Sequence, residues 1–494
     1  MTEPALALAQ APAPLYERLA AQARRTPDAV ALHTAERDWA YADLLALADA
    51  TAQDWAAQGL QPGARIGWLG HNTAQMLAAL LACARLGAVW VPLNWRLAAP
   101  ELAAIARHAG LAALFGTPEL LALAEQVRAQ VQLPVDDGGG TTGQARPGDV
   151  MLVYTSGTTG EPKGAMHTQA GMVANIDAAL AVQGLTADDR VLAVLPLFHV
   201  GGLCIQVLPA LAVGAQVALH ARFDPAAWLA DVAAWRPSTS LLVPAVMQAL
   251  ITHPGWPSAD LSSLRFLNSG SSIVPVEQIQ AFHARGVPMA QVYGSTETGP
   301  FSIALGPDQA LAHVGQVGWP APGVQVQLAD ANGQPVAAGE VGEIQLKAPN
   351  LMRGYHRLPA GTGFENGWFA TGDLARADAQ GALTVVGRSK DMIISGGENI
   401  YPAEIENLVV GWPGVIEVAV VGLPDARWGE VPVLVLQVQP GSAPDLDALR
   451  EHFAQRLARY KHPRRIVVVD ALPRTALGKV QKAQLRARFQ AEPG

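Results

Sequence analysis

Residues 154–164 have the side-chain types in this chain that best suit phosphate chemistry, and they read Y-T-S-G-T-T-G-E-P-K-G. Their glycines allow close backbone approach and positive φ, while hydroxyl side chains and one lysine add donors and positive charge. Backbone N–H groups, hydroxyls and a cation together suit a polyphosphate. We expect phosphate contacts from Thr155, Ser156, Gly157, Thr158, Thr159, Gly160 and Lys163.

This loop is not a Walker A motif, because Pro162 precedes Lys163 and Gly164 follows it. A Walker motif has Gly-Lys-Ser/Thr opening a helix, whereas proline lacks an N–H and has a restricted φ. The alternative is a flexible Gly/Thr turn between two elements. That alternative suits G-T-T-G alone better than the whole run, which directly follows the apolar residues 150–153.

Several polar segments further along the chain suit a nucleotide and a metal ion. They are N-S-G-S-S at 268–272, Q-V-Y-G-S-T-E-T-G at 291–299, W-F-A-T-G-D at 368–373 and G-R-S-K-D at 387–391. Tyr293 offers a flat π-face to a base, Glu297 a hard oxygen ligand to Mg²⁺, and Asp373 two acceptor oxygens. Seen alone, a loop glutamate is usually solvated and an aspartate in T-G-D is usually a turn former.

Three further segments complete the set of motifs: L-P-L-F-H-V-G-G-L at 195–203, I-S-G-G-E-N-I-Y-P-A-E-I-E at 394–406 and L-P-R-T-A-L-G-K-V at 472–480. In type and order, from residue 154 to residue 479, the motifs resemble those of the adenylate-forming superfamily. That superfamily includes acyl-CoA synthetases, the adenylation domains of peptide synthetases, and luciferases. The branch that this chain resembles is the acid:CoA ligases, which implies ATP and CoA as co-substrates and Mg²⁺ as cofactor.

The resemblance implies roles for individual nucleotide-site residues. The backbone near Ser269 and the ring of Tyr293 enclose adenine, Thr296 contacts the α-phosphate, Glu297 holds Mg²⁺, and Asp373 accepts both ribose hydroxyls. The ATP and AMP set also includes Gly270, Ser271, Gln291, Gly294 and Arg388. The catalytic residues implied are Lys479, Thr158, Glu297 and His199.

The C-terminal motifs resemble those that serve CoA and domain motion. Lys390 corresponds to a hinge between a large and a small domain, and Lys479 to an adenylation lysine that enters the site from the small domain. Gly396 and Gly397 resemble the lining of a pantetheine tunnel. Trp428, Tyr460 and Arg464 are candidates for the nucleotide end of CoA. The alternative for the basic run 460–465 is a solvated face, and for each lysine an exposed side chain.

The acid pocket is the least determined part of the site. Its candidates are mostly apolar: Phe198, His199, Val200, Val292 and Phe301. On its own, His199 is equally consistent with a hydrogen-bonded loop histidine. No arginine lies within residues 291–299 to pair with a second carboxylate, which argues against malonate-type diacids. An aromatic acid of the benzoate or hydroxycinnamate type, or a medium-chain fatty acid, fits, and we favour the aromatic acid.

Two other functions are weaker alternatives. An amino-acid adenylation domain serving a carrier protein usually has an aspartate in the segment that here reads Phe198-His199-Val200, and we expect no carrier segment after Gly494. A non-catalytic nucleotide-binding protein would not need Thr158, Glu297, Asp373 and Lys479 together. Departures from the family pattern are modest: Ala370 precedes T-G-D, and Leu477 precedes Gly478.

Hydrophobic runs predict the elements that must position these motifs. We expect strands at 65–69, 88–91 (closed by Pro92) and 111–115, and helices at 74–86 (capped by Asn72 and Thr73) and 100–108. Strands that alternate with helices indicate parallel sheets. We predict an α/β fold: a large N-terminal AMP-binding domain of parallel βα sheets with a small β subdomain (1–389), then a small mobile α+β C-terminal domain (390–494).

Composition bounds the function class. The chain has 494 residues, a net charge of −8 and two cysteines, Cys83 and Cys204. An acidic balance argues against a nucleic-acid partner, and so few cysteines fit a reducing cytoplasm. The apolar runs are too short to span a bilayer. We expect small-molecule partners, with a homodimer as an open alternative.

Overall fold

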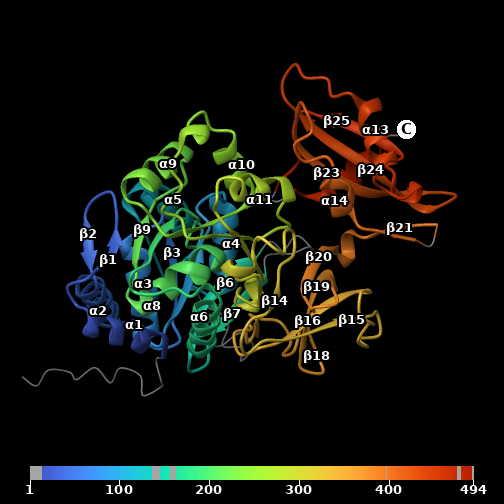
Figure 1. The fold of residues 1–494 in the computed structure, drawn as a ribbon. Helices are drawn as coiled ribbons and strands as arrows, with labels where there is room; N and C mark the ends of the chain where they lie inside the picture. Colours follow the sequence, from blue (N-terminus) through green and yellow to red (C-terminus); the bar gives the residue numbers. More distant parts are fainter. Residues whose placement is uncertain (1–13, 136–144, 156–162, 397, 475–479, 492–494) are drawn as a thin grey trace, which may run out of the picture.

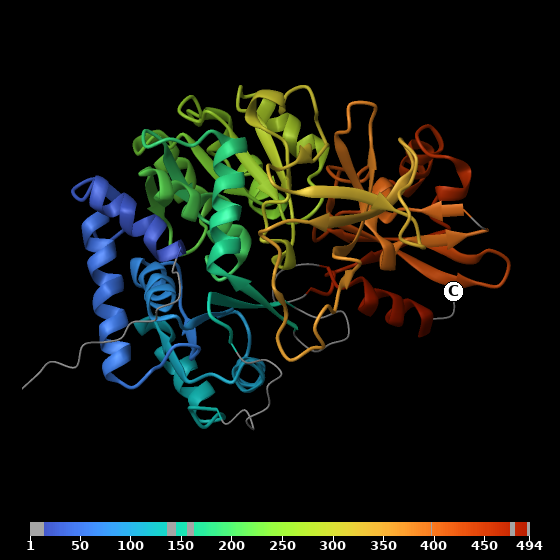
Figure 2. The same cartoon turned by 90° about the horizontal axis from the view of Figure 1, so that it is seen from below.

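The computed structural model describes residues 14–135, 145–155, 163–396, 398–474 and 480–491. It has a large N-terminal domain of mixed α/β sheets and a smaller C-terminal domain. In both views the C-terminal sheet lies at the opposite end of the molecule from α1 (Pro14–Arg25) and α2 (Tyr41–Ala57) (Figures 1 and 2). Among the described residues, no helix is long and apolar enough to cross a membrane.

Two large sheets form the N-terminal domain, and their inner strands are parallel, as predicted. The first has the order β17 (Gly354–Tyr355), β7 (Lys163–Thr168), β6 (Asp149–Thr155), β4 (Val89–Leu93), β3 (Arg65–Leu69), β5 (Ala113–Gly116). The second has the order β14 (Trp319–Pro320), β13 (Ile303–Ala304), β12 (Met289–Tyr293), β11 (Leu267–Gly270), β10 (Thr239–Leu242), β8 (Arg190–Ala193), β9 (Gln216–Leu219), β1 (Val30–His33), β2 (Asp38–Ala40). Antiparallel pairs occur only toward their edges, as in β6–β7 and β12–β13.

Two smaller sheets follow. The β subdomain holds β15 (Gln325–Ala329), β16 (Val341–Lys347), β19 (Trp368–Ala377), β18 (Phe364–Glu365) and β20 (Leu383–Arg388). The C-terminal sheet holds β22 (Glu398–Ile400), β21 (Ile393–Ser395), β24 (Gly429–Val438), β23 (Val415–Asp425) and β25 (Arg465–Val469). In Figure 1 the β subdomain lies directly below the C-terminal sheet.

Helices cover the large sheets and the C-terminal sheet. They are α3 (Ala74–Leu86), α4 (Ala99–Ala109), α5 (Leu121–Arg128), α6 (Gln169–Gln183), α7 (Val200–Gly202), α8 (Leu208–Val213), α9 (Pro225–Ala234), α10 (Pro244–Ile251), α11 (Val276–His283), α12 (Pro402–Glu406), α13 (Leu446–Ala454) and α14 (Lys482–Ala491). A π-helical turn, Leu203–Val207, joins α7 to α8. π-Helical turns are rare and are often found at functional sites.

Local sequence signals explain where α3 begins and ends. The Thr73 side chain accepts a hydrogen bond from the N–H of Met76, and Gly87 ends the helix with φ of 72°. Asn72, which we expected to share the cap, instead bonds across the fold. Its Oδ1 accepts from the N–H of Leu197 at 2.8 Å, and its Nδ2 donates to the carbonyl of Leu195 at 2.9 Å. Asn72 therefore holds the loop that leads to Phe198.

The predicted end of the strand at 88–91 was wrong. Pro92 does not close its strand: it lies opposite Trp68, and β4 continues to Leu93. The missing N–H of Pro92 is tolerated because β4 pairs with its other neighbour, β6, only at Trp90. No bond to β6 is therefore required at residue 92. Residues 268–270 of the N-S-G-S-S motif lie within β11, and residues 368–373 of the W-F-A-T-G-D motif lie within β19, so neither set forms a turn.

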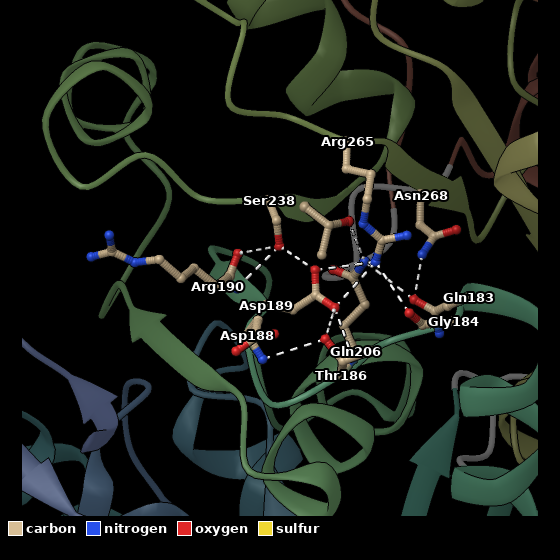
Figure 3. Close-up of polar contacts among 11 residues, drawn as sticks. Gln183, Gly184, Thr186, Asp188, Asp189, Arg190, Gln206, Ser238, Arg265 and Asn268 are labelled. Atoms are coloured by element: carbon tan, nitrogen blue, oxygen red, sulfur yellow. Dashed lines mark hydrogen bonds and ion pairs between the residues drawn. The ribbon is translucent and has the colours of Figure 1, made fainter. Parts of the chain in front are cut away.

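A polar network fastens the amino ends of β8, β10 and β11 (Figure 3). The buried Asp189 carboxylate accepts from Ser238 Oγ at 2.7 Å, and it forms an ion pair with Arg265 at 3.1 Å. Deeper in the core, Asn268 Nδ2 donates to Gln183 Oε1 at 2.6 Å. These bonds fix the register of three parallel strands at the edge remote from their carboxyl ends.

We expect Asp189→Ala to lower the free energy of unfolding by roughly 2 kcal/mol, since Ser238 and Arg265 lose a buried acceptor. Arg265 is 44% exposed, so water replaces part of its lost bonding. The measurement is the urea midpoint of the full chain. Asp188→Ala is the matched control, because the Asp188 side chain is exposed. Equal midpoints for the two variants would contradict the role of the network.

Candidate functional site

The carboxyl end of β12 meets the β subdomain at a buried aspartate. Tyr293, the last residue of β12, donates its hydroxyl proton to Asp373 Oδ2 at 2.9 Å. Arg388 Nε lies 2.8 Å from Asp373 Oδ1, because β19 and β20 pair these two residues directly. Burial, and next the Asp373 charge, raise the pKa of Tyr293 well above its usual range, so the phenol remains a donor. The sequence-predicted trio Tyr293, Asp373 and Arg388 is thus brought together.

The adenine-loop candidates offer backbone rather than side chains. Ser269 is fully buried, and its hydroxyl points to Met247 Sδ at 3.3 Å. A Cβ at Gly270 would lie 2.3 Å from the Val292 carbonyl oxygen, so the strands approach too closely there for a side chain. Ser271 has φ of +70°, a strained value for a non-glycine residue. Strain of this kind is often found at ligand sites.

Gln291 and Gly294 have structural partners of their own. The Gln291 side chain is buried, and its Nε2 donates to the carbonyl of Gln316 at 2.7 Å, which holds the chain beside β12. A Cβ at Gly294 would lie 1.7 Å from the Pro300 carbonyl oxygen. Glycine is therefore required at 294 by the folding of residues 294–300 back on themselves.

Glu297 lies in a 3₁₀ turn, Thr296–Thr298, that the segment before β17 holds in place. The N–H of Met352 donates to the Glu297 carbonyl at 2.7 Å, and Asn350 Nδ2 donates to the Thr298 carbonyl at 2.9 Å. The Tyr355 hydroxyl donates to Glu297 Oε1 at 2.9 Å. Sequence reasoning missed Tyr355, because β17 is too short to show a strand pattern; R-G-Y-H at 353–356 was the only signal.

Lys163 begins β7, opposite Thr155 at the end of β6. Its Nζ lies 5.5 Å from the centroid of the Tyr355 ring, so the lysine and Glu297 both contact the same tyrosine. This contact joins the phosphate-loop motif to the metal-ligand motif. The expected phosphate contacts Ser156, Gly157, Thr158, Thr159 and Gly160 lie outside the described residues.

Glu297 is the metal-ligand candidate among the described residues, and it does not belong to a cluster of ligands. No group of three His, Cys, Asp or Glu side chains that could hold an ion is found in the described part of the chain. Glu297 nevertheless fits Mg²⁺, which takes one or two protein carboxylates and completes its shell with phosphate oxygens and water. Only one Glu297 oxygen accepts the Tyr355 hydroxyl, so acceptor capacity remains on the carboxylate.

The acid-pocket candidates lie in two apolar clusters. Phe198 and Val200 belong to a cluster that contains residues of both large sheets, whereas Val292 and Phe301 belong to a cluster formed by the second sheet and the β subdomain. The centroids of the His199 and Phe198 rings are 4.3 Å apart. The four apolar candidates are all at most 5% exposed.

Asn175, which sequence reasoning missed, links the two apolar clusters. Its Nδ2 donates to the Cys204 carbonyl at 2.8 Å, in the π-helical turn, and its Oδ1 accepts from the N–H of Phe301 at 2.9 Å. Beside it, Gly201 faces Ser271 Oγ and Ile205 Cδ1: a Cβ there would lie 3.6 and 4.0 Å from them. Gly201, next to the acid-pocket candidate Val200, therefore lies beside the adenine-loop candidate Ser271.

In the C-terminal domain, three CoA candidates converge. The N–H of Gly396 donates to the Trp428 carbonyl at 2.7 Å, and a Cβ at Gly396 would lie 2.8 Å from the Trp428 ring. The Arg464 guanidinium lies 5.7 Å from that ring. Tyr460 is exposed, and the neighbouring Lys461 is paired with Glu404 at 2.5 Å, which neutralises part of the basic run. Gly397 lies outside the described residues.

Lys390 lies between the β subdomain and the C-terminal sheet. Arg486 of α14 donates to the Lys390 carbonyl at 3.3 Å and approaches the Asp391 carboxylate at 3.5 Å. Partial burial lowers the pKa of Lys390. Residues 475–479, with Lys479, lie outside the described residues; next to them, Arg474 pairs with Val480 in a β-bridge and forms an ion pair with Glu417.

Comparison with known proteins places both parts of this geometry in one family. The family model described as AMP-binding enzyme matches residues 19–356, and that described as AMP-binding enzyme C-terminal domain matches residues 404–479. An indoleacetate–CoA ligase of Aromatoleum aromaticum is 43% identical over 93% of this chain and 95% of its own. A feruloyl-CoA synthase of an Amycolatopsis species is 41% identical over 95% and 97%.

A solved structure has the same fold. ATP-bound MatB from Rhodopseudomonas palustris superposes with a TM-score of 0.87 at 30% identity, covering 97% of this chain and 99% of its own. The fold expected from the sequence, with a large α/β domain and a smaller C-terminal domain, is thereby confirmed.

We expect Asp373→Ala to weaken binding of both ATP and AMP by about ten- to a hundred-fold, because hydrogen bonds to a charged group contribute most to binding. Calorimetric titration of each nucleotide gives the dissociation constants. Asp330→Ala is the control: its carboxylate caps a turn after β15, accepting from the N–H groups of Asn332 and Gln334. Unchanged affinity in Asp373→Ala would remove this carboxylate from the nucleotide site.

Proposed function

Because the chain belongs to the AMP-binding enzyme family, we propose that it is an ATP-dependent acid–CoA ligase with an aromatic carboxylic acid as its substrate. One observation carries the proposal. Tyr293 donates to Asp373, the carboxylate proposed to bind ribose. Four residues later, Glu297 accepts from Tyr355, whose ring also contacts Lys163 of the phosphate loop. The same short segment therefore serves the ribose side and the phosphate side of one bound nucleotide.

The proposed first half-reaction activates the acid. A carboxylate oxygen of the acid attacks the α-phosphorus of ATP, the bond to pyrophosphate breaks, and an acyl-adenylate forms. Lys163 and the residues 155–160 hold the pyrophosphate, while Thr296 and Lys479 stabilise charge at the α-phosphate. Mg²⁺, held through Glu297, would supply further charge neutralisation on the phosphates.

The proposed second half-reaction makes the thioester. The CoA thiol attacks the acyl carbon, the bond to AMP breaks, and AMP leaves. The small domain, residues 390–494, would turn about Lys390, withdraw Lys479 and present Gly396 and Gly397 to the pantetheine arm. Closure of this kind excludes water from the reactive adenylate. Trp428, Tyr460 and Arg464 would contact the nucleotide end of CoA.

Apolar walls favour an aromatic acid. Phe198 and Phe301 belong to separate apolar clusters, and Asn175 bonds both the Cys204 carbonyl in the π-helical turn and the N–H of Phe301. The relatives that act on indoleacetate and feruloyl groups support the same class. A medium-chain fatty acid is the second candidate, because apolar walls also suit an alkyl chain. An amino acid is disfavoured, since residues 198–200 hold no carboxylate for its ammonium group. A cytoplasmic location and a homodimer remain predictions.

A panel of acids tests the proposal. With ATP, Mg²⁺ and CoA, arylacetic and hydroxycinnamic acids are expected to release pyrophosphate with kcat/KM at least about ten-fold above that for an eight-carbon fatty acid. AMP release is expected to require CoA. Amino acids serve as the control for the carrier-dependent alternative. If no organic acid yields pyrophosphate, the ligase proposal fails.

Gly201 allows the pocket to be probed directly. We expect Gly201→Val to lower kcat/KM for the aromatic acid by about ten-fold or more, since its methyl groups would fill space beside Ser271 and Ile205. The urea midpoint of the variant should stay unchanged, which separates pocket loss from misfolding. Gly202 is unsuitable, because a Cβ there would lie 2.3 Å from the Pro196 carbonyl oxygen. Unaltered acid selectivity would place the pocket elsewhere.

Lys479→Ala tests the division between half-reactions. The adenylation rate is expected to fall about 10²–10³-fold, as for loss of one oriented charge-stabilising donor. Thioester formation from supplied acyl-adenylate should be spared. Equal loss of both steps would reject the proposed division.

A further inference from the structure

Tyr355 lies on β17, the outermost strand of the first large sheet, next to the hairpin formed by β6 and β7. β17 pairs with β7 so that Tyr355 is opposite Ala165. Directly opposite residues share a face of the sheet, and so do residues two apart along a strand. Tyr355 and Lys163 therefore project from the same face, which explains why the lysine Nζ lies 5.5 Å from the ring centroid.

The segment that carries Tyr355 is firmly anchored. Arg353 forms two bonds to the Asp149 carboxylate: Nε to Oδ1 at 2.9 Å and Nη2 to Oδ2 at 2.8 Å. The Asp149 side chain is only 1% exposed, and Asp149 begins β6. The N–H of Met352 donates to the Glu297 carbonyl at 2.7 Å. Tyr355 is thus held at a set distance from both the hairpin and the Glu297 turn.

The hydroxyl and the ring of Tyr355 contact different groups. The hydroxyl donates to Glu297 Oε1 at 2.9 Å, and the ring lies beside Lys163. A donor on one carboxylate oxygen restricts rotation of Glu297 and leaves the other oxygen for a cation.

We propose that Tyr355 is a positioning residue that orients the Glu297 carboxylate toward Mg²⁺ and keeps Lys163 directed at the same phosphates. This inference rests on the proposed function of Glu297 and Lys163. Tyr355 acts through these two side chains and touches no reacting atom. Its hydroxyl serves the metal side of the site, and its ring serves the lysine side, so the two contributions are separable by substitution.

Calorimetric titration of ATP, once with Mg²⁺ and once with EDTA, tests the proposal without turnover. Tyr355→Phe keeps the ring and loses the bond to Glu297. We expect its ATP affinity in Mg²⁺ to fall about ten-fold, as for loss of a hydrogen bond to a charged group, with no change in EDTA. Tyr355→Leu also loses the ring, and its affinity in EDTA should fall a further two- to five-fold, roughly the size of an exposed cation–π contact.

Tyr16→Phe is the matched control. Tyr16 also donates its hydroxyl to a carboxylate, Asp49 Oδ1 at 2.6 Å, but it does so between α1 and α2. This variant should bind ATP as the unaltered protein does, with and without Mg²⁺. If Tyr355→Phe behaves like Tyr16→Phe, Tyr355 has only a packing role and the inference is overturned.

The same titrations separate this inference from the proposed function. If the unaltered protein binds ATP no better with Mg²⁺ than with EDTA, the Glu297 assignment itself fails. If Mg²⁺ strengthens ATP binding to the unaltered protein and Glu297→Gln abolishes that gain, the metal assignment holds. The Tyr355 variants then decide the positioning role alone. Equal loss in Mg²⁺ and in EDTA for Tyr355→Phe would indicate general damage to the site and would also overturn the inference.

Discussion

The hydrogen bond from Tyr293 to Asp373 is the contact on which the nucleotide site depends, because it joins two sheets that share no strand. Tyr293 ends β12 in the second large sheet, and Asp373 lies within β19 of the β subdomain. A buried carboxylate is costly unless it is paired and hydrogen-bonded. Tyr293 and Arg388 together meet that requirement, so the carboxylate that we propose binds ribose also joins the two sheets.

The two ends of the parallel strands have different tasks. At the amino ends, Asp189, Ser238 and Arg265 form a closed polar network that holds β8, β10 and β11 together (Figure 3). At the carboxyl ends, Ser271 and Tyr293 begin the loops of the site. Open α/β sheets place ligands outside the carboxyl ends of their strands. The network therefore lies at one edge, and the strained backbone of Ser271 lies at the other.

Much of the candidate site could be predicted because its residues lie in short contiguous motifs. The glycine–hydroxyl run before Lys163, and T-E at Thr296 and Glu297, have side-chain chemistry that suits phosphate and Mg²⁺ without knowledge of the fold. Gly87 marked the end of α3 for the same local reason, since only glycine adopts positive φ at low cost. Where a signal lies within a few residues, the sequence is enough.

Other residues could not be found in this way. Asn72, Asn175 and Tyr355 each act on a partner more than fifty residues away: Leu197, Phe301 and Glu297. Pro92 was read as a strand end because its tolerance depends on which neighbouring strand is paired at that point.

By itself, then, the sequence determined the family, and it predicted residues that would contact the nucleotide. Only the tertiary structure decided which side chains hold those residues in place and which hydrogen bonds join the two apolar clusters. The physical reason is range. Backbone freedom and side-chain chemistry are properties of a few adjacent residues, whereas a hydrogen bond between distant segments exists only after the sheets have packed.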